Sequence, residues 1–257
     1  MTHRAYCSFD DSTPSVTLEE TEAHHVLHVL RMKSGDRLEL FDGLGRTASG
    51  KITAVTRRSV DVAIDAQQYH AASDFAHLCV AVAPPKGDRL KWMLEKLTEL
   101  GVSEITLLQT ERTVVTPAET KVEKLKANII SAGRQSKRVF LPILQPLTPF
   151  EELLQSLYST DTDQRGNRIV IAHPQSLQPE SLKNTAVMDK NVTSSAIPEA
   201  RTTLLIGPEG GFTDEEVQQA VDAGATPISW PGTILRIETA AIVFSTLLIS
   251  GPSSQQL

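Results

Sequence analysis

The stretch LLIGPEGGFTDEEV, residues 204–217, constrains the fold of this 257-residue chain more than any other. Three consecutive large apolar residues at 204–206 indicate a buried strand. The three glycines within residues 207–211 allow positive φ and a close approach of the backbone to a ligand. Thr213 is a suitable N-cap and Glu216 stands three residues later, which is the spacing of a capping box. The stretch therefore predicts a strand, a tight glycine loop and the start of a helix.

Strand–loop–helix units of this kind often bind phosphate at the helix N-terminus. Here the charge argues against a phosphate ligand, because four carboxylates lie within eight residues: Glu209, Asp214, Glu215 and Glu216. They complement the positive helix end and would repel an anion. The loop has no Lys or Arg, and neither GxxxxGK[ST] nor GxGxxG is present. A neutral or cationic ligand with an adenine-sized apolar part fits better, and an ordinary glycine turn is the alternative.

A second stretch, ILRIETAAIVFSTLLI at residues 234–249, adds to this pattern. Residues 231–233, Pro-Gly-Thr, indicate a loop, and a helix is predicted to open at Glu238. That helix is apolar nearly all round, which is typical of a buried helix rather than an amphipathic one. Arg236 and Glu238 are therefore expected at the mouth of a buried helix, where a charge must be paired or in use.

GPEGGF(S/T)xxE followed by ILRxETAA resembles the RNA methyltransferases of the SPOUT superfamily. More narrowly, it resembles the ribosomal RNA small subunit methyltransferase E family, which methylates N3 of a uridine in 16S rRNA. HHVLHVLRMKSGDRLELFDGLG and KGDRLKWMLEKLTELGVSEI carry the same resemblance, which covers nearly the whole chain.

The resemblance implies an α/β fold in two domains. Residues 1–72 would form a PUA-like β-barrel that binds RNA. Residues 73–257 would form a SPOUT methyltransferase domain with a mostly parallel sheet and a deep trefoil knot, a rare exception to the rule that chains do not thread loops. S-adenosylmethionine would be the methyl donor, 16S rRNA of the small ribosomal subunit the substrate, and a homodimer the expected assembly.

The bulk properties agree with a soluble globular protein, since 40% of the residues are hydrophobic and 22% are charged. The net charge of −6 argues weakly against a protein coated in nucleic acid but permits a local basic face. Two cysteines without metal-ligand spacing indicate a reducing compartment. No secretory signal and no apolar run of about 18 residues is found. We therefore expect a cytoplasmic location and no membrane association.

Along the first domain, short and mostly alternating segments at residues 38–41, 52–55 and 60–64 predict the strands of a small barrel. One helix is expected over residues 19–30, with Thr17 as a possible cap. The polar segment 67–74 is the expected domain boundary.

In the second domain, strands are predicted at 75–83, 105–108, 168–172 and 204–206. Helices are predicted at 89–100, with Gly101 as C-cap, at 120–135 and at 150–158. Strands that alternate with helices favour a parallel sheet. Residues 175–200 are interpreted as a long polar connection.

Between residues 121 and 138 there are six basic residues and one acid. The resembled family carries a Gln-Ser-x-Arg motif there, which favours contact with an RNA backbone, although a solvated helix face is the alternative. The candidates for RNA contact are Arg4, His24, Arg31, Arg134 and Arg138, with Lys33 beside them, and each has an ordinary surface charge as its alternative. No metal is expected at His24, His25 and His28, because no HExxH motif or acidic third ligand accompanies them.

The resemblance implies a cofactor pocket built from the 204–217 and 234–249 stretches and from a residue after a neighbouring strand, at the edge where ligands gather in α/β sheets. Its candidate members are His173, Ile206, Gly207, Gly210, Gly211, Trp230, Ile234, Leu235 and Thr239. The sequence departs from the family at one point, because Trp230 and Pro231 stand where Leu-Gly is usual. This departure predicts a shifted backbone in the loop.

For catalysis, N3 of uracil must lose its proton before or during attack on the methyl group. Arg236 is the candidate that stabilises the developing charge on the ring oxygens, and Glu209 is a weaker candidate for the base. A structural ion pair of Arg236 with Glu238 or Glu209 is the alternative. Two other functions stay open: a non-catalytic RNA-binding or ribosome-assembly factor, and a methyltransferase of another rRNA or tRNA position.

Overall fold

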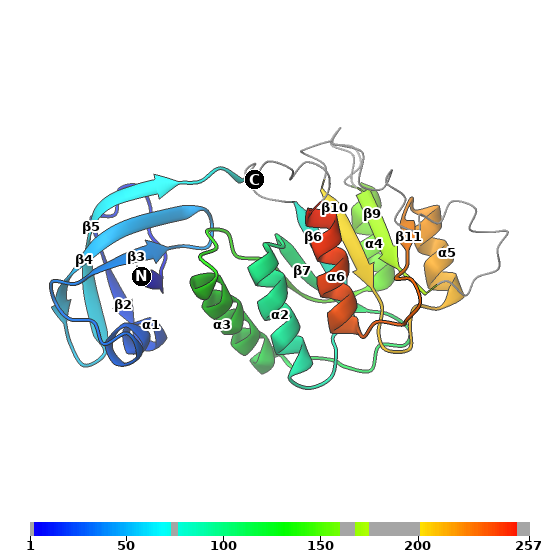
Figure 1. The fold of residues 1–257 in the computed structure, drawn as a ribbon, viewed down its shortest axis with the longest axis horizontal. Coiled ribbons are helices and arrows are strands. Elements are labelled where there is room, and N and C mark those ends of the chain that lie inside the picture. The colour runs from blue at the N-terminus through cyan, green and yellow to red at the C-terminus, as the bar shows by residue number, and fades with distance from the viewer. Residues whose placement is uncertain (1–2, 73–76, 160–167, 175–200, 251–257) are drawn as a thin grey trace. The chain divides into compact units, whose positions relative to one another are not determined.

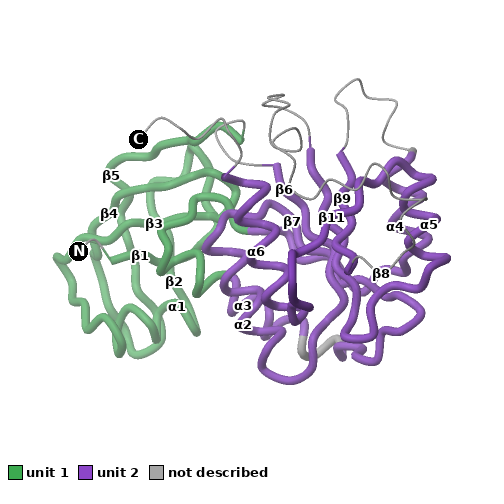
Figure 2. Tube along the Cα trace, turned by 45° about the vertical axis from the view of Figure 1, so that its right-hand side comes forward, with its two compact units in different colours: residues 1–75, 130–141 green, residues 76–129, 142–257 purple. Residues whose placement is uncertain are grey.

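The structure is a computed structural model that describes residues 3–72, 77–159, 168–174 and 201–250. The predicted connection at 175–200 and the end of the boundary segment at 73–74 lie outside the described residues. Contacts divide the chain into two compact units, 1–75 with 130–141 and 76–129 with 142–257 (Figure 2). The sequence-based division at residue 72 did not anticipate that 130–141 belongs with the N-terminal unit.

Unit 1 contains a curled five-stranded sheet in the order β1-β3-β4-β5-β2 (Figure 1). Its strands are β1 (Arg4–Tyr6), β2 (Ser15–Glu19), β3 (Arg37–Phe41), β4 (Arg46–Val55) and β5 (Ser59–Tyr69). The pair β1–β3 is parallel and the other pairs are antiparallel. The three strand segments predicted in this region lie within β3, β4 and β5. β1 and β2 were missed: β1 has only three residues, and the alternating sequence of β2 leads directly into α1.

The helix expected at 19–30 begins as α1 (Glu20–His24) and continues as one π-helical turn, η1 (His25–Val29). The prediction that Thr17 caps it is wrong. Pairing with β5 keeps the chain extended as far as Glu19, so Thr17 lies in β2 and its hydroxyl donates to Asp61 Oδ1 at 2.8 Å. Glu19 occupies the N-cap position instead and makes no side-chain capping bond.

The segment 130–141 begins in the last part of α3 (Glu119–Gln135) and ends at Leu141, which lies against glycines of unit 1. The amide of Leu141 donates to the carbonyl of Gly43 at 2.9 Å. A Cβ atom at Gly133 would lie 2.0 Å from Leu141 Cδ2, far inside van der Waals contact. A larger residue at this position would force the Leu141 side chain to move.

Unit 2 is built on a six-stranded sheet in the order β11-β9-β10-β6-β7-β8, with every pair parallel. Its strands are β6 (Leu78–Val82), β7 (Glu104–Gln109), β8 (Ile143–Pro149), β9 (Arg168–Ala172), β10 (Thr202–Ile206) and β11 (Thr226–Ile228). The predicted parallel sheet is confirmed. β8 and β11 were not predicted, because β8 contains two prolines and β11 has only three residues.

Helices cover both faces of this sheet (Figure 1). α2 (Arg89–Leu100) and α6 (Ile237–Ile249) pack together on one face, where α6 contacts β6 and β10. α4 (Phe150–Ser159) and α5 (Asp214–Asp222) pack on the other face, around a core that includes Leu205 and Phe212. α2 has the predicted bounds, and its predicted C-cap Gly101 adopts the left-handed conformation with φ of 85°.

The prediction of a wholly buried α6 is only half right. Ala241 and Phe244 are buried, whereas Ile242, Val243 and Leu247 are partly exposed on the single chain. A helix that lies on a sheet face is covered by that sheet on one side only, so its apolar outer side lacks cover here. The trefoil knot stays a prediction.

Candidate functional site

The glycine loop at 207–213 connects β10 to α5 in the predicted manner. Thr213 Oγ1 accepts a hydrogen bond from the amide of Glu216 at 3.1 Å, and Glu216 Oε2 accepts one from the amide of Thr213 at 2.9 Å. The predicted capping box is therefore confirmed. Gly211 has a φ of 72°, a conformation that side chains disfavour, and a Cβ at Gly207 would lie 3.0 Å from the Phe212 ring.

Arg112, on the segment after β7, holds the glycine loop from one side. Its Nη1 donates to the carbonyls of Gly210 at 2.9 Å and Phe212 at 3.3 Å. A Cβ at Gly210 would lie 3.3 Å from Arg112 Cδ, which explains the second glycine. Beside it, the amide of Glu111 donates to Glu216 Oε1 at 2.8 Å. The sequence reasoning missed both residues; their only sequence signal is a polar turn directly after a predicted strand.

Arg89, at the start of α2, contacts both the 204–217 stretch and the 234–249 stretch. Its Nη2 pairs with Glu209 Oε1 at 3.0 Å, and its Nη1 lies 3.7 Å from Glu238 Oε2. The second distance is too long for a hydrogen bond but is within ion-pair range. Within the described residues, the ion pairs of Glu209 and Glu238 go to Arg89 and none goes to Arg236. The structure therefore does not show the alternative that pairs Arg236 with either carboxylate.

Arg236 is exposed and occupies the N-cap position of α6, where its carbonyl accepts from the amide of Ala240 at 2.8 Å. The helix begins at Ile237, one residue before the predicted start. The apolar residues of the preceding loop are exposed as well: Trp230 by 39% and Ile234 by 83%. Exposed apolar side chains in this loop are available to a ligand or a second surface.

His173 follows β9 at the same edge of the sheet, and its amide donates to the carbonyl of Ile228 at 2.9 Å. Burial lowers the pKa of the His173 imidazole, and the nearby Asp214 carboxylate opposes this shift. The ring is therefore neutral at neutral pH. Both ring nitrogens are buried and have no hydrogen-bond partner among the described residues. A buried polar group without a partner fits a site that a ligand completes.

Parallel strands place their carboxyl ends at one edge, so the loops after β6, β9, β10 and β11 share that edge. The predicted cofactor residues lie at this edge: Ile206 ends β10, Gly207, Gly210 and Gly211 follow it, and His173 follows β9. Trp230, Ile234 and Leu235 lie in the loop after β11, and Thr239 lies in the first turn of α6. Arg89 contacts the loop after β10 through Glu209 and the first turn of α6 through Glu238. The open space beside Gly211 and the unpaired imidazole of His173 leave room and polar groups for a ligand such as a nucleoside.

Of the residues of unit 1 that were predicted to contact RNA, some have partners within the protein and others are exposed. Arg4 is buried, pairs with Glu39 at 2.8 Å and lies 4.4 Å from the Phe41 ring centroid. Arg134 forms an ion pair with Glu22, and Arg138 is partly buried. His24 and Arg31 are exposed.

Arg4 Nη1 also donates to the carbonyl of Arg138 at 3.3 Å. The contacts of Arg4 and Arg134 are therefore internal contacts of unit 1. The sequence pattern identified these positions as charged but did not reveal their internal partners.

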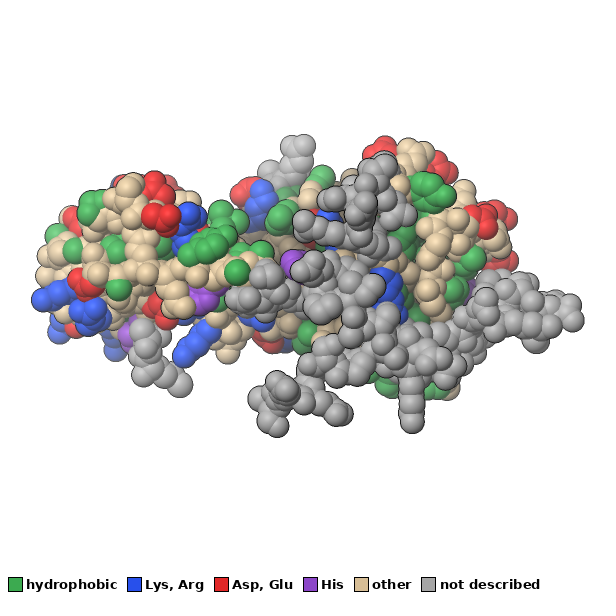
Figure 3. All heavy atoms as spheres, turned by 90° about the horizontal axis from the view of Figure 1, so that it is seen from above, with side chains coloured by type: hydrophobic (Ala, Val, Ile, Leu, Met, Phe, Trp, Pro, Cys, Tyr) green, Lys and Arg blue, Asp and Glu red, His purple; other side chains and the backbone are tan. Residues whose placement is uncertain are grey.

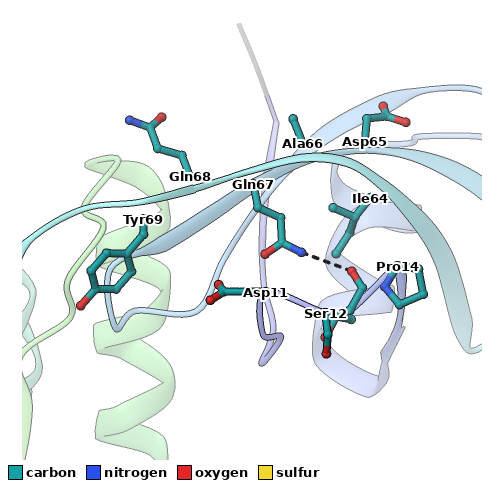
Figure 4. A pocket seen from close by; sticks show the side chains of 10 residues that line it. Asp11, Ser12, Pro14, Ile64, Asp65, Ala66, Gln67, Gln68 and Tyr69 are labelled. Carbon is teal, nitrogen blue, oxygen red and sulfur yellow. Dashed lines mark hydrogen bonds between the residues drawn. The ribbon is translucent and has the colours of Figure 1, made fainter.

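Unit 1 also carries an open groove of about 610 Å³ along β5. Figure 4 shows Gln67 extending from the strand toward residues 11–14, where its amide donates to the carbonyls of Asp10 and Thr13. No predicted site residue lines this groove. Among the described residues, no cluster of three His, Cys, Asp or Glu side chains could hold a metal ion. In the same ranges, every helix is too short or too polar to span a membrane.

Comparisons with known proteins agree with this geometry. A family model described as an RNA methyltransferase domain matches residues 72–249, and a model of the RNA methyltransferase PUA domain matches residues 18–65. The parallel sheet with a glycine loop at its carboxyl edge, joined to a small β unit, is thus the architecture of an RNA methyltransferase.

The ribosomal RNA small subunit methyltransferase E of Bacillus subtilis is 27% identical over 252 residues, 94% of each chain. Three solved structures are similar with a TM-score of 0.77 each. A probable rRNA methyltransferase of Porphyromonas gingivalis is 30% identical over 95% of both chains. A putative methyltransferase of Legionella pneumophila in complex with S-adenosylmethionine is 27% identical, over 96% of this chain and 97% of that one.

The third structure is a ribosomal RNA small subunit methyltransferase E of Neisseria gonorrhoeae bound to S-adenosylmethionine, 25% identical over 95% of both chains. The chain belongs to the ribosomal RNA small subunit methyltransferase E family.

Proposed function

We propose that this protein transfers the methyl group of S-adenosylmethionine to N3 of a uridine in 16S rRNA. The single observation that carries the proposal is the arrangement around Arg89, which brings the GPEGG loop and the start of α6 to one guanidinium. This arrangement supports a single site built from the two stretches that resemble the family's cofactor motifs. Related structures with bound S-adenosylmethionine support the identity of the donor.

S-adenosylmethionine supplies an electrophilic methyl group on a sulfonium. The residues that would hold it are His173, Ile206, Gly207, Gly210, Gly211, Trp230, Ile234, Leu235 and Thr239. No atom lies within 4 Å of a Cβ position at Gly211 or Gly232, so a ligand has room beside the backbone there.

The chemistry of this chain's own residues centres on charge at the base to be methylated. Arg236 is our candidate for stabilising negative charge on the uracil oxygens as N3 loses its proton, because a guanidinium stays charged at every working pH. Its exposure at the N-cap of α6 leaves it accessible to an RNA base. Glu209 is the weaker candidate for the proton acceptor, because its carboxylate is engaged by Arg89 at 3.0 Å.

Unit 1 is proposed to bind the RNA. In Figure 3, Lys and Arg side chains gather at one end of this unit. Exposed cations lie on its turns, namely Arg31, Lys33, Arg57 and Arg58. Ser34 Oγ donates to the carbonyl of Thr53 at 3.0 Å, which ties the first turn to the strand that enters the second. Together with His24, these residues are better placed for phosphate contact than the buried Arg4 or the paired Arg134. We retain Arg138 as a further candidate.

A homodimer is proposed as the working assembly. The outer side of α6 carries the partly exposed residues Ile242, Val243 and Leu247, which a second subunit would cover. Since its proposed substrate is rRNA, we place the protein in the cytoplasm, where ribosomal subunits assemble.

Two measurements test the proposal. Calorimetry with S-adenosylmethionine should show one site per chain, and lack of binding at high concentration would leave only a non-catalytic RNA-binding or assembly factor. Mass mapping of 16S rRNA from a deletion strain should show the loss of one N3-methyluridine. If that nucleotide stays fully methylated, the protein acts on another rRNA or tRNA position.

A further inference from the structure

We infer that Arg89 is a positioning residue that joins the GPEGG loop to the first turn of α6 before the cofactor binds. The nature of the cofactor rests on the proposed function, whereas the contacts of Arg89 do not depend on it. Every nitrogen of this guanidinium has a partner, and the partners come from three different segments. Nε donates to the carbonyl of Lys86 at 3.2 Å, Nη2 pairs with Glu209 at 3.0 Å, and Nη1 lies 3.7 Å from Glu238.

The three segments follow β6, follow β10 and begin α6, so they are distant along the chain. A guanidinium presents its donors in a rigid planar fork and can engage all three at once. A lysine ammonium is a single point of charge on a flexible stem, and it could replace only part of this arrangement. The geometry therefore requires an arginine, and a cation alone is not sufficient.

Glu238 depends most on this contact. Its side chain is only 9% exposed, and its Oε2 is buried without a hydrogen-bond partner among the described residues. A buried carboxylate is costly unless a counter-charge lies near it. Arg89 supplies that charge, and through Glu238 it fixes the first turn of α6, which begins directly after Arg236.

The loop that precedes α6 has little else to hold it. Residues 231–234 are exposed, and Gly232 has a φ of 86° with no atom near its Cβ position. A loop with few buried contacts opens readily. The link through Arg89 to the GPEGG loop therefore limits the number of arrangements that the ligand-free site adopts, which reduces the ordering that binding must impose.

Arg112 provides a matched control within the same site. It binds the carbonyls of Gly210 and Phe212, so it holds the GPEGG loop. Neither of these contacts reaches α6 or the loop before it. Loss of Arg112 should loosen one loop, and loss of Arg89 should loosen both.

The experiment measures amide hydrogen exchange in the ligand-free protein for wild type, Arg89→Met, Arg89→Lys and Arg112→Met. Arg89→Met should raise exchange in residues 207–213 and in residues 231–238, while β6 and β10 keep their protection. Arg112→Met should raise it in 207–213 alone. Exchange in Arg89→Lys should lie between that of wild type and that of Arg89→Met, because lysine restores the charge without the planar set of donors.

Calorimetry then tests whether the ordering of the ligand-free site affects cofactor binding. If the arrangement that binds the cofactor falls to about a tenth of the molecules in Arg89→Met, the apparent Kd for S-adenosylmethionine rises about tenfold. The double variant Arg89→Met/Glu238→Gln should bind more tightly than Arg89→Met, because the buried carboxylate is gone.

Unchanged exchange at 231–238 in Arg89→Met would overturn the inference, and so would equal loss of protection throughout the sheet. If wild type itself fails to bind S-adenosylmethionine, the proposed function is wrong, and the exchange pattern still decides the role of Arg89.

Discussion

The Glu216 carboxylate accepts hydrogen bonds from the end of the glycine loop and from the segment after β7, so its removal should destabilise the protein. One oxygen accepts the amide of Thr213 at 2.9 Å and the other accepts the amide of Glu111 at 2.8 Å. The residue is only 8% exposed, so neither amide would readily gain water after truncation. Hydrogen bonds to a charged group contribute about 1.5–3 kcal/mol each, so Glu216→Ala should lower the free energy of unfolding by about 3–5 kcal/mol.

Urea denaturation followed by circular dichroism measures this loss. Glu216→Gln should cost about half as much, because its single carbonyl oxygen can serve only one of the two amides. Glu215→Ala is the control, since Glu215 is exposed in the same first turn and should change stability by about 0.5 kcal/mol through the helix dipole. A loss below about 1 kcal/mol for Glu216→Ala would refute the reasoning that both amides depend on this side chain.

Four further outcomes are expected. Gly133→Ala should destabilise the protein by about 2 kcal/mol or more in the same urea assay, since the new methyl group meets Leu141, and an unchanged midpoint would contradict this packing. Arg236→Ala should lower kcat while the Kd for S-adenosylmethionine changes little; a near wild-type kcat would remove Arg236 from the mechanism. Burial lowers the pKa of His173 in the folded chain, so the unfolded chain takes up its proton first as the pH falls. The stability of wild type relative to His173→Asn should therefore decrease below about pH 6.5, the ordinary pKa of histidine, and a pH-independent difference would contradict it. Arg58→Ala should weaken RNA binding and make the salt dependence of log K shallower by about one unit, and an unchanged salt slope would exclude a phosphate contact.

The sequence correctly predicted those helix ends that are set by residues close together in the chain. The bounds of α2 follow from its apolar period and from Gly101, and the start of α5 follows from Thr213 and Glu216. β8 escaped prediction because its prolines argue against a strand, although it lies at the edge of the sheet, where proline is tolerated.

The contacts that assemble the site were not accessible from the sequence. Arg89 meets Glu209 across 120 residues, and Arg112 meets Gly210 across 98. No local pattern specifies which cation reaches which carboxylate at such separations. For the same reason Arg4 was expected on the surface, whereas the fold buries it beside Glu39 and Phe41.

The place of Leu141 has a consequence for the independence of the N-terminal unit. A peptide cut near residue 72 would lack Leu141, which lies against Gly43, and the carbonyl of Arg138 that accepts from the Arg4 guanidinium. Such a fragment should be less stable than the same fold within the intact chain. The β unit is therefore no freely transferable module: a fusion or a gene rearrangement that moved it alone would leave part of its interior behind.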